Sequence, residues 1–90
     1  MYRVKLKDKA RRQLDKIFGS RDADRIVAAI LALYENPRPV GIKKLTGNIF
    51  RIRIGDWRII YSISDKDRVI TIGKIVRRSE DTYNGVKDLF

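Results

Sequence analysis

The sequence contains no cysteine and no histidine. The first absence excludes disulfide bonds, thiolate catalysis and cysteine-ligated zinc. The second removes the usual general base at neutral pH and the commonest metal ligand. A Ser-His-Asp triad is therefore excluded, and no glycine-containing segment forms a phosphate-binding loop or a dinucleotide fingerprint. We expect a function that needs no cofactor and no metal.

Long apolar stretches are also missing. The longest is Ile26–Tyr34, whereas a helix needs about 20 residues to span a bilayer. Residues 1–18 are basic and lack the apolar stretch of a signal peptide. We therefore expect a cytoplasmic protein with no membrane partner. A length of 90 residues predicts one domain, covering residues 1–90.

Positive charge is the most informative feature of the composition. Lysine and arginine number 21 against 11 acidic residues, which gives a net charge of +10. Such an excess attracts phosphate polyanions or an acidic protein partner. The alternative is a merely solubilising surface, but a net charge of ~2–8 is enough for that in a small domain. The charge therefore favours a nucleic acid or an acidic protein as the working partner.

Hydrophobic periodicity in the first half of the chain predicts one strand and two helices. Residues 2–6 alternate apolar and basic side chains, as in a half-buried strand. Apolar residues then recur at helical spacing over 8–18 and again over 21–34. A glycine ends the first helix, and Ser20 is placed to cap the second. Two prolines end the second helix, so residues 37–48 are predicted to be a connection.

The second half of the chain predicts three strands. Residues 50–54 and 57–63 alternate in polarity across a Gly-Asp turn, and residues 69–76 are mostly β-branched. The predicted order is β-α-α-β-β-β. Two consecutive helices can form a hairpin that covers one face of a small antiparallel sheet, which is an α+β arrangement. The other face of the sheet is then left open.

Period-two alternation assigns several arginines to this open face. Arg51, Arg53 and Arg58 each oppose the apolar side of their strand. If the apolar sides face the helices, the three guanidinium groups emerge together on the open face. Continued alternation along the last strand places Ile75 and Arg77 on that face as well. Trp57 and Tyr61 fall on the opposite, packed side.

Neighbouring arginines repel each other, and a polyanionic partner relieves that repulsion. Arginine binds phosphate bidentately and keeps its charge at all working pH values. The group could therefore hold a scissile phosphate and stabilise the charge of its transition state. The alternative is a solvated basic face with no site. Tyr83, which follows Arg77 and Arg78, either stacks on a base or packs on the domain.

Two segments carry a family resemblance. Residues 45–61 read LTGNIFRIRIGDWRIIY, and residues 77–83 read RRSEDTY. With the helical hairpin before them and the chain length, they resemble the RelE/ParE superfamily of toxin–antitoxin toxins over nearly the whole chain. The Arg-Arg-Ser-Glu-x-x-Tyr tail narrows the resemblance to the RelE branch. It implies a single RelE-like toxin domain.

The RelE branch comprises ribosome-dependent mRNA endonucleases, or mRNA interferases, which inhibit translation. They cut the codon in the ribosomal A site without a metal, as the 2′-hydroxyl attacks the adjacent phosphate. By similarity, Arg51 and Arg53 correspond to the two basic residues of the first catalytic strand, and Arg58 corresponds to the phosphate-stabilising arginine. Arg77 or Arg78 corresponds to a late arginine that helps the leaving group. Tyr83 corresponds to the tyrosine that stacks on and orients the base.

This chain departs from the RelE pattern at the first two of those positions. In the best-known RelE both are lysines, one of them proposed as the general base, whereas here both are arginines. Because arginine does not readily give up a proton, the identity of the general base is left open. Other ribosome-dependent relatives use a Glu–His pair, which this chain lacks.

The resemblance also implies partners: the ribosome with its mRNA, and an acidic antitoxin of RelB type. The net charge of +10 would steer such an antitoxin toward the toxin. Two other functions stay open. One is a ParE-like inhibitor of DNA gyrase, and the other is a non-catalytic RNA-binding or repressor component, since fold alone does not fix function.

Overall fold

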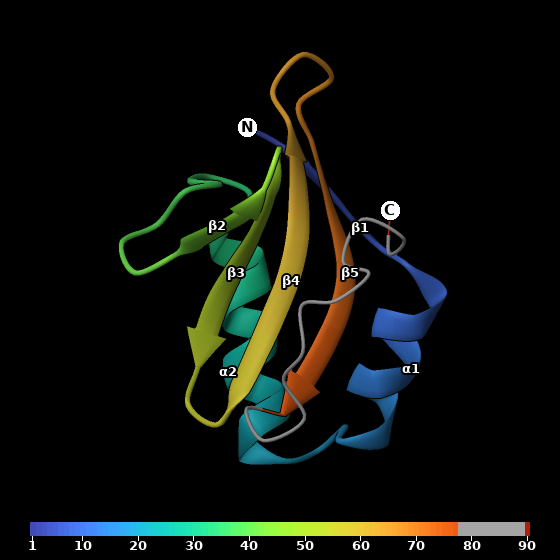
Figure 1. Cartoon of the computed structure of the whole chain (residues 1–90). Coiled ribbons are helices and arrows are strands. Elements are labelled where there is room, and N and C mark those ends of the chain that lie inside the picture. The colour runs from blue at the N-terminus through green and yellow to red at the C-terminus, as the bar shows by residue number, and fades with distance from the viewer. Residues whose placement is uncertain (78–89) are drawn as a thin grey trace.

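The computed structural model describes residues 1–77 and residue 90 (Figure 1). Arg78 and Tyr83, both predicted to belong to the site, therefore lie outside the described residues. In chain order the elements are β1 (Arg3–Leu6), α1 (Asp8–Lys16), α2 (Arg21–Ala32), β2 (Lys43–Thr46), β3 (Ile49–Ile54), β4 (Trp57–Ser64) and β5 (Val69–Arg77).

The strands form one sheet in the order β1-β5-β4-β3-β2. The pairs β2–β3, β3–β4 and β4–β5 are antiparallel, whereas β1 runs parallel to β5. The sheet is thus mixed, and the prediction of a purely antiparallel sheet is wrong. Alternation along a strand shows which side chains share a face but not the direction of the neighbouring strand.

Strand β2 was also missed, because its segment was predicted to be a connection. It is a four-residue edge strand, and its pairing with β3 shifts register between Lys44 and Thr46. So short and irregular a strand leaves little alternation in the sequence.

The two helices cover one face of the sheet, as predicted (Figure 1). Ala23, Ile26 and Ile30 of α2 are buried, and Ala10 is the buried residue of α1. They pack against core residues of β3, β4 and β5. Burial of each isoleucine is worth about 1.5–3 kcal/mol, so this layer supplies much of the driving force for folding.

The predicted helix boundary at Ser20 is confirmed. The Ser20 hydroxyl accepts a hydrogen bond from the backbone N–H of Ala23 at 3.0 Å, which satisfies one free donor of the first turn of α2. Helix α1 ends two residues earlier than predicted, at Lys16. Phe18 therefore lies beyond the helix and is 86% exposed.

Trp57 and Tyr61 are packed on the helix side, as predicted, with 7% and 0% exposure. The indole N–H of Trp57 donates to Oδ2 of Asp22 at 3.0 Å, and the Tyr61 hydroxyl donates to the carbonyl of Pro37 at 2.9 Å. Burial raises the pKa of Tyr61 to about 12. Both aromatic side chains therefore anchor the sheet to the segments around it.

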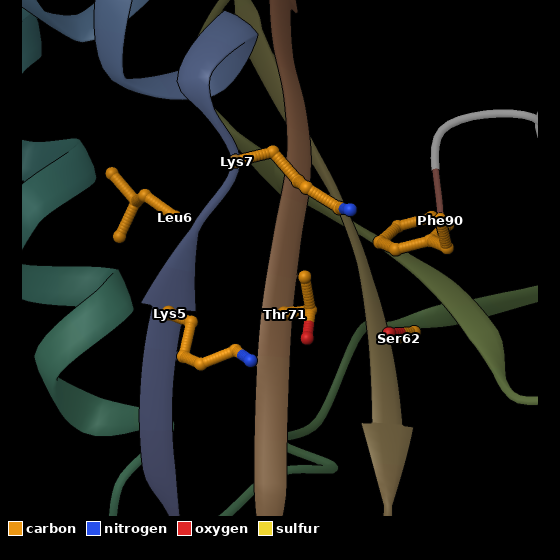
Figure 2. Close-up of a pocket in the computed structure, with 6 residues that line it drawn as sticks. All are labelled: Lys5, Leu6, Lys7, Ser62, Thr71 and Phe90. Atoms are coloured by element: carbon orange, nitrogen blue, oxygen red, sulfur yellow. The ribbon is translucent and has the colours of Figure 1, made fainter.

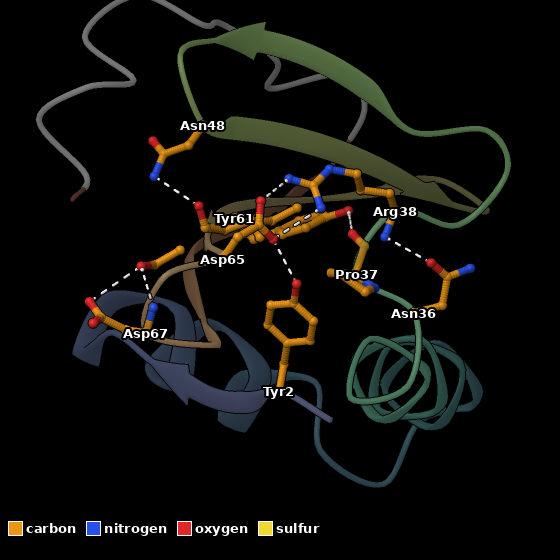
Figure 3. Close-up of polar contacts among 10 residues, drawn as sticks. Tyr2, Asn36, Pro37, Arg38, Asn48, Tyr61, Asp65 and Asp67 are labelled. Carbon is orange, nitrogen blue, oxygen red and sulfur yellow. Dashed lines mark hydrogen bonds and ion pairs between the residues drawn. The ribbon is translucent and has the colours of Figure 1, made fainter.

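A polar network joins the β4–β5 turn to the two segments beside it (Figure 3). The Arg38 guanidinium donates to both carboxylate oxygens of Asp65, at 2.8 and 3.2 Å. The Tyr2 hydroxyl donates to Oδ1 of Asp65 at 2.6 Å. Arg38 also lies over the ring of Phe50, 5.6 Å from its centre. One carboxylate thus ties the N-terminus and the α2–β2 connection to the turn.

Candidate active site on the open sheet face

Strands β3 and β4 bring three arginines together on the sheet face that the helices leave uncovered. Arg53 of β3 lies directly opposite Arg58 of β4, and Arg51 lies opposite Ile60. The intervening residues Phe50, Ile52 and Ile54 belong to, or pack against, the core on the helix side. The prediction that Arg51, Arg53 and Arg58 share the open face is therefore confirmed.

A tight turn holds the two arginine-bearing strands in register. Residues 55 and 56 form it, and Gly55 adopts a φ of 58°, a left-handed conformation that favours glycine. The pairing is continuous from Ile54 opposite Trp57 to Ile49 opposite Ser62. The arginines therefore project from a rigid two-stranded platform, which suits a site that must hold its geometry.

Burial differs among the three arginines. Arg53 is exposed, Arg51 is half-buried, and Arg58 is only 9% exposed. A guanidinium that is held among its neighbours loses little conformational freedom when it binds an anion. The structure therefore provides one fixed cation, Arg58, beside two more accessible ones.

Carboxylates are missing from the strands that form this face. None of the five described strands contains aspartate or glutamate. The ion pairs within the described residues join Arg11 to Asp8 and Arg38 to Asp65, elsewhere in the fold. Within the same residues, the buried Nε of Arg51 has no hydrogen-bond partner. The positive charge of Arg51 and Arg53 is thus available to an external anion.

Strand β5 contains a β-bulge that changes which residues face the arginines. Ile60 of β4 pairs with Lys74, but the next residue, Tyr61, pairs with Ile72. Gly73 is the additional residue, and one additional residue reverses the alternation beyond it. Lys74 consequently lies on the open face beside Ile60.

The predictions for Ile75 and Arg77 are wrong for this reason. Ile75 is 1% exposed and belongs to the core on the helix side. Arg77 lies opposite Trp57, and its guanidinium carbon is 4.8 Å from the centre of the Trp57 ring. This cation–π contact holds Arg77 on the face away from Arg58. The glycine inside the strand was the signal for the bulge.

Two lysines of the open face were not predicted. Lys74 is brought there by the bulge, and Lys43 of β2 lies opposite Arg51. The face is not purely polar, because Leu45 packs on the buried Ile49 and Ile60. The basic side chains therefore surround a small apolar centre. Together they form the cationic face, which consists of Lys43, Arg51, Arg53, Arg58 and Lys74.

A pocket of about 310 Å³ continues the same side of the sheet across β4, β5 and β1 (Figure 2). Thr71 pairs with both Ser62 and Lys5. Figure 2 shows the amines of Lys5 and Lys7 and the two hydroxyls on one side of the sheet, with Phe90 beside them. Ammonium and hydroxyl donors suit phosphate and sugar oxygens, so a strand of nucleic acid could extend from the cationic face over this pocket.

The described residues contain no group of three or more Cys, His, Asp or Glu side chains placed to hold a metal ion. Nor is any helix among residues 1–77 long and apolar enough to cross a membrane. The arrangement of charge can neutralise a phosphodiester and the extra negative charge that its phosphorus gains during attack.

A family model of the ParE toxin of type II toxin–antitoxin systems, parDE, matches residues 4–82. This chain belongs to the RelE/ParE toxins. No curated protein sequence matches it significantly.

Similarity to solved structures places this chain among the RelE-like members of the family. A chain of the archaeal RelE–RelB complex from Pyrococcus horikoshii OT3 is 30% identical, with a TM-score of 0.75 over 89% of this chain and 98% of that one. The isolated E. coli RelE toxin has a TM-score of 0.76 at 17% identity, and each chain is covered in full. The YoeB/ParE toxin from Agrobacterium tumefaciens, at 13% identity, has a TM-score of 0.71 over 83% of this chain and 96% of that one. The last two show a shared fold.

Proposed function

We propose that this toxin is a ribosome-dependent mRNA endonuclease that cuts the codon in the ribosomal A site. The observation that carries the proposal is the cluster of Arg51, Arg53 and Arg58 on a sheet face whose described strands contain no acidic residue. A binding-only surface gains most from charge spread along the RNA backbone. Cations concentrated at one position, one of them nearly buried, instead suit the stabilisation of a single reacting phosphate.

The proposed reaction is transfer of the phosphoryl linkage within the RNA. The 2′-oxygen attacks the adjacent phosphorus, the bond to the 5′-oxygen breaks, and the products are a cyclic phosphate and a 5′-hydroxyl. Arg58 would hold the non-bridging oxygens, and Arg51 and Arg53 would bind the same or a flanking phosphate. The ribosome would fix the mRNA so that positioning supplies much of the rate.

The remaining proposed residues follow from the family resemblance. Tyr83 would stack on a base of the codon. Because Arg77 stacks on Trp57 on the helix side, the role of the late arginine would fall to Arg78.

We also propose an acidic antitoxin of RelB type as the partner. The similar archaeal RelE is a component of a RelE–RelB complex. The net charge of +10 favours an acidic chain, and exposed Phe18 and Leu31 offer apolar contacts on the helical side. We expect the complex to be less salt-sensitive than RNA binding, since apolar contacts are little screened.

The first experiment is cleavage of one mRNA by the purified, partner-free toxin, with and without ribosomes that hold an empty A site. Cuts only on the ribosome, within the A-site codon, are the expected result. An intact mRNA in both samples, with a toxin shown to be folded, contradicts the proposal.

A second candidate function is inhibition of DNA gyrase, which the match to the ParE family model favours. Expression of such an inhibitor would cause DNA damage without cleavage of transcripts. A supercoiling assay with purified gyrase, run beside the cleavage assay, separates the two functions.

A further inference from the structure

The bulge at Gly73 places one amine among the guanidinium groups. Lys74 and Arg51 both flank Ile60, one from β5 and the other from β3. Neighbouring strands lie about 4.8 Å apart, so the backbones of these two residues are roughly 10 Å apart across Ile60. Arg58 lies two residues from Ile60 on the same face of β4. A phosphate above Ile60 would therefore have Arg51 on one side and Lys74 on the other.

Lys74 differs chemically from the arginines around it. A guanidinium stays protonated at all working pH values, whereas an ammonium group can release a proton to a strongly basic oxygen. Among the described residues, no hydrogen bond or ion pair holds the Lys74 amine. The Lys74 residue is half-buried, and its backbone position on the open face is fixed by the pairing with Ile60. Lys43, the other lysine of the cationic face, is exposed on the edge strand β2, on the far side of Arg51.

The proposed cleavage needs a proton at one particular atom. When the 2′-oxygen attacks in line, the leaving 5′-oxygen is on the opposite side of the phosphorus. That oxygen takes both electrons of the breaking bond and becomes a strongly basic alkoxide unless it is protonated. A donor on the opposite side of the phosphate from the attacking group is therefore required for a fast reaction.

We propose that Lys74 is the general acid that protonates the leaving 5′-oxygen, an inference that rests on the proposed endonuclease function. The 2′-oxygen loses its proton to solvent and bonds to phosphorus. As the bond from phosphorus to the 5′-oxygen breaks, the proton moves from Nζ of Lys74 to that oxygen. The products are the cyclic phosphate and the 5′-hydroxyl, and the neutral amine regains a proton from solvent.

The test compares two RNA linkages in single-turnover cleavage on the ribosome. One substrate has the natural scissile linkage, and in the other sulfur replaces the bridging 5′-oxygen. A thiolate leaves without protonation, because thiols are much stronger acids than alcohols. We expect Lys74→Ala to cut the natural linkage roughly 100- to 10,000-fold more slowly than the unmodified toxin. On the sulfur linkage the two proteins should react at similar rates.

Three further variants make the comparison specific. Lys74→Arg keeps the charge but not the acid, so it should be slow on the natural linkage and restored on the sulfur linkage. Arg58→Ala should stay slow on both, because sulfur does not replace a charge at the non-bridging oxygens. Lys44→Ala is the control for the loss of a lysine. Lys44 of β2 pairs with Phe50 and therefore lies away from the cationic face, so this variant should cleave normally.

The outcomes separate the two proposals. Suppose that the unmodified toxin cuts the natural linkage. If Lys74→Ala is then equally slow on both linkages, or is unimpaired on the natural one, the role of Lys74 is overturned. The endonuclease function is not affected by either result. If the folded, unmodified toxin cuts neither linkage, the endonuclease function itself is wrong, and the role of Lys74 is overturned with it.

Discussion

The sharpest test of the arginine cluster is Arg58→Ala. Arg58 is the least exposed cation of the cationic face, directly opposite Arg53 and paired with Val76 on its other side. Removal of one donor aimed at transition-state charge typically lowers kcat by about 100- to 1,000-fold, or about 2.7–4 kcal/mol. We expect a loss of this size in single-turnover cleavage, with little change in the affinity for the ribosome.

The effect of Arg58→Ala on stability should be much smaller. Truncation removes the packing of a long aliphatic stem, which destabilises the sheet. It also removes the repulsion between Arg58 and Arg53, and like charges directly opposite on paired strands cost about 0.2–1 kcal/mol. Because the two effects oppose, the free energy of unfolding should change by about 1 kcal/mol or less. Urea unfolding measures this directly.

The control for Arg58→Ala is Arg12→Ala, an equal loss of charge and size at an exposed position of α1. It should cleave at the rate of the unmodified toxin. Arg58→Lys keeps the charge but loses the two-pronged donor geometry, so its rate should be intermediate. A folded Arg58→Ala protein that cleaves as fast as Arg12→Ala would refute the reasoning from burial and charge.

Three other predictions concern the fold that supports the site. The hydrogen bond from Arg38, followed by that from Tyr2, lowers the pKa of Asp65. The ionised Asp65 carboxylate therefore stabilises the folded state fully above its unfolded pKa of about 3.9. This stabilisation is lost as the pH falls through the lower pKa that Asp65 has in the folded state. Asp65→Asn should reduce the urea midpoint at pH 7 but not at a pH of about 2, and an equal difference at both pH values contradicts this assignment. Gly55→Ala places a Cβ at a φ of 58°, 2.8 Å from the Arg25 guanidinium, and should cost about 1–2 kcal/mol of stability; an unchanged thermal midpoint would count against it. Tyr61→Phe leaves the Pro37 carbonyl without its 2.9 Å donor and should cost about 1–2 kcal/mol in urea unfolding; a variant as stable as the unmodified toxin would show that this bond contributes nothing.

The parts of the fold that were predictable depend on local chemistry. Ser20 caps α2 because a hydroxyl before a helical run can accept from its first turn. The shared face of Arg51, Arg53 and Arg58 follows from strict alternation in two strands that a two-residue turn joins. Neither inference needs information about distant parts of the chain.

The parts that were not predictable depend on long-range pairing. The parallel pairing of β1 with β5 joins segments from opposite ends of the described chain, and the alternation within either strand does not encode it. Strand β2 forms because it pairs with β3, since four residues with an irregular register have little intrinsic propensity to form a strand. Lys43 was missed as part of the cationic face for the same reason.

The bulge in β5 decides which basic side chain lies on the cationic face. If the strand paired without the bulge, Gly73 would lie opposite Ile60, and the alternation would place Lys74 on the helix side and Arg77 on the face of Arg58. With it, Arg77 is held by the ring of Trp57, while an amine takes the position on the cationic face. Alignment with a relative can match Arg77 to a catalytic arginine and yet assign it to the wrong side of the sheet. The residue of β5 that pairs with Ile60 therefore decides which side chain lies at the proposed site, and a basic residue near the end of β5 does not by its identity alone.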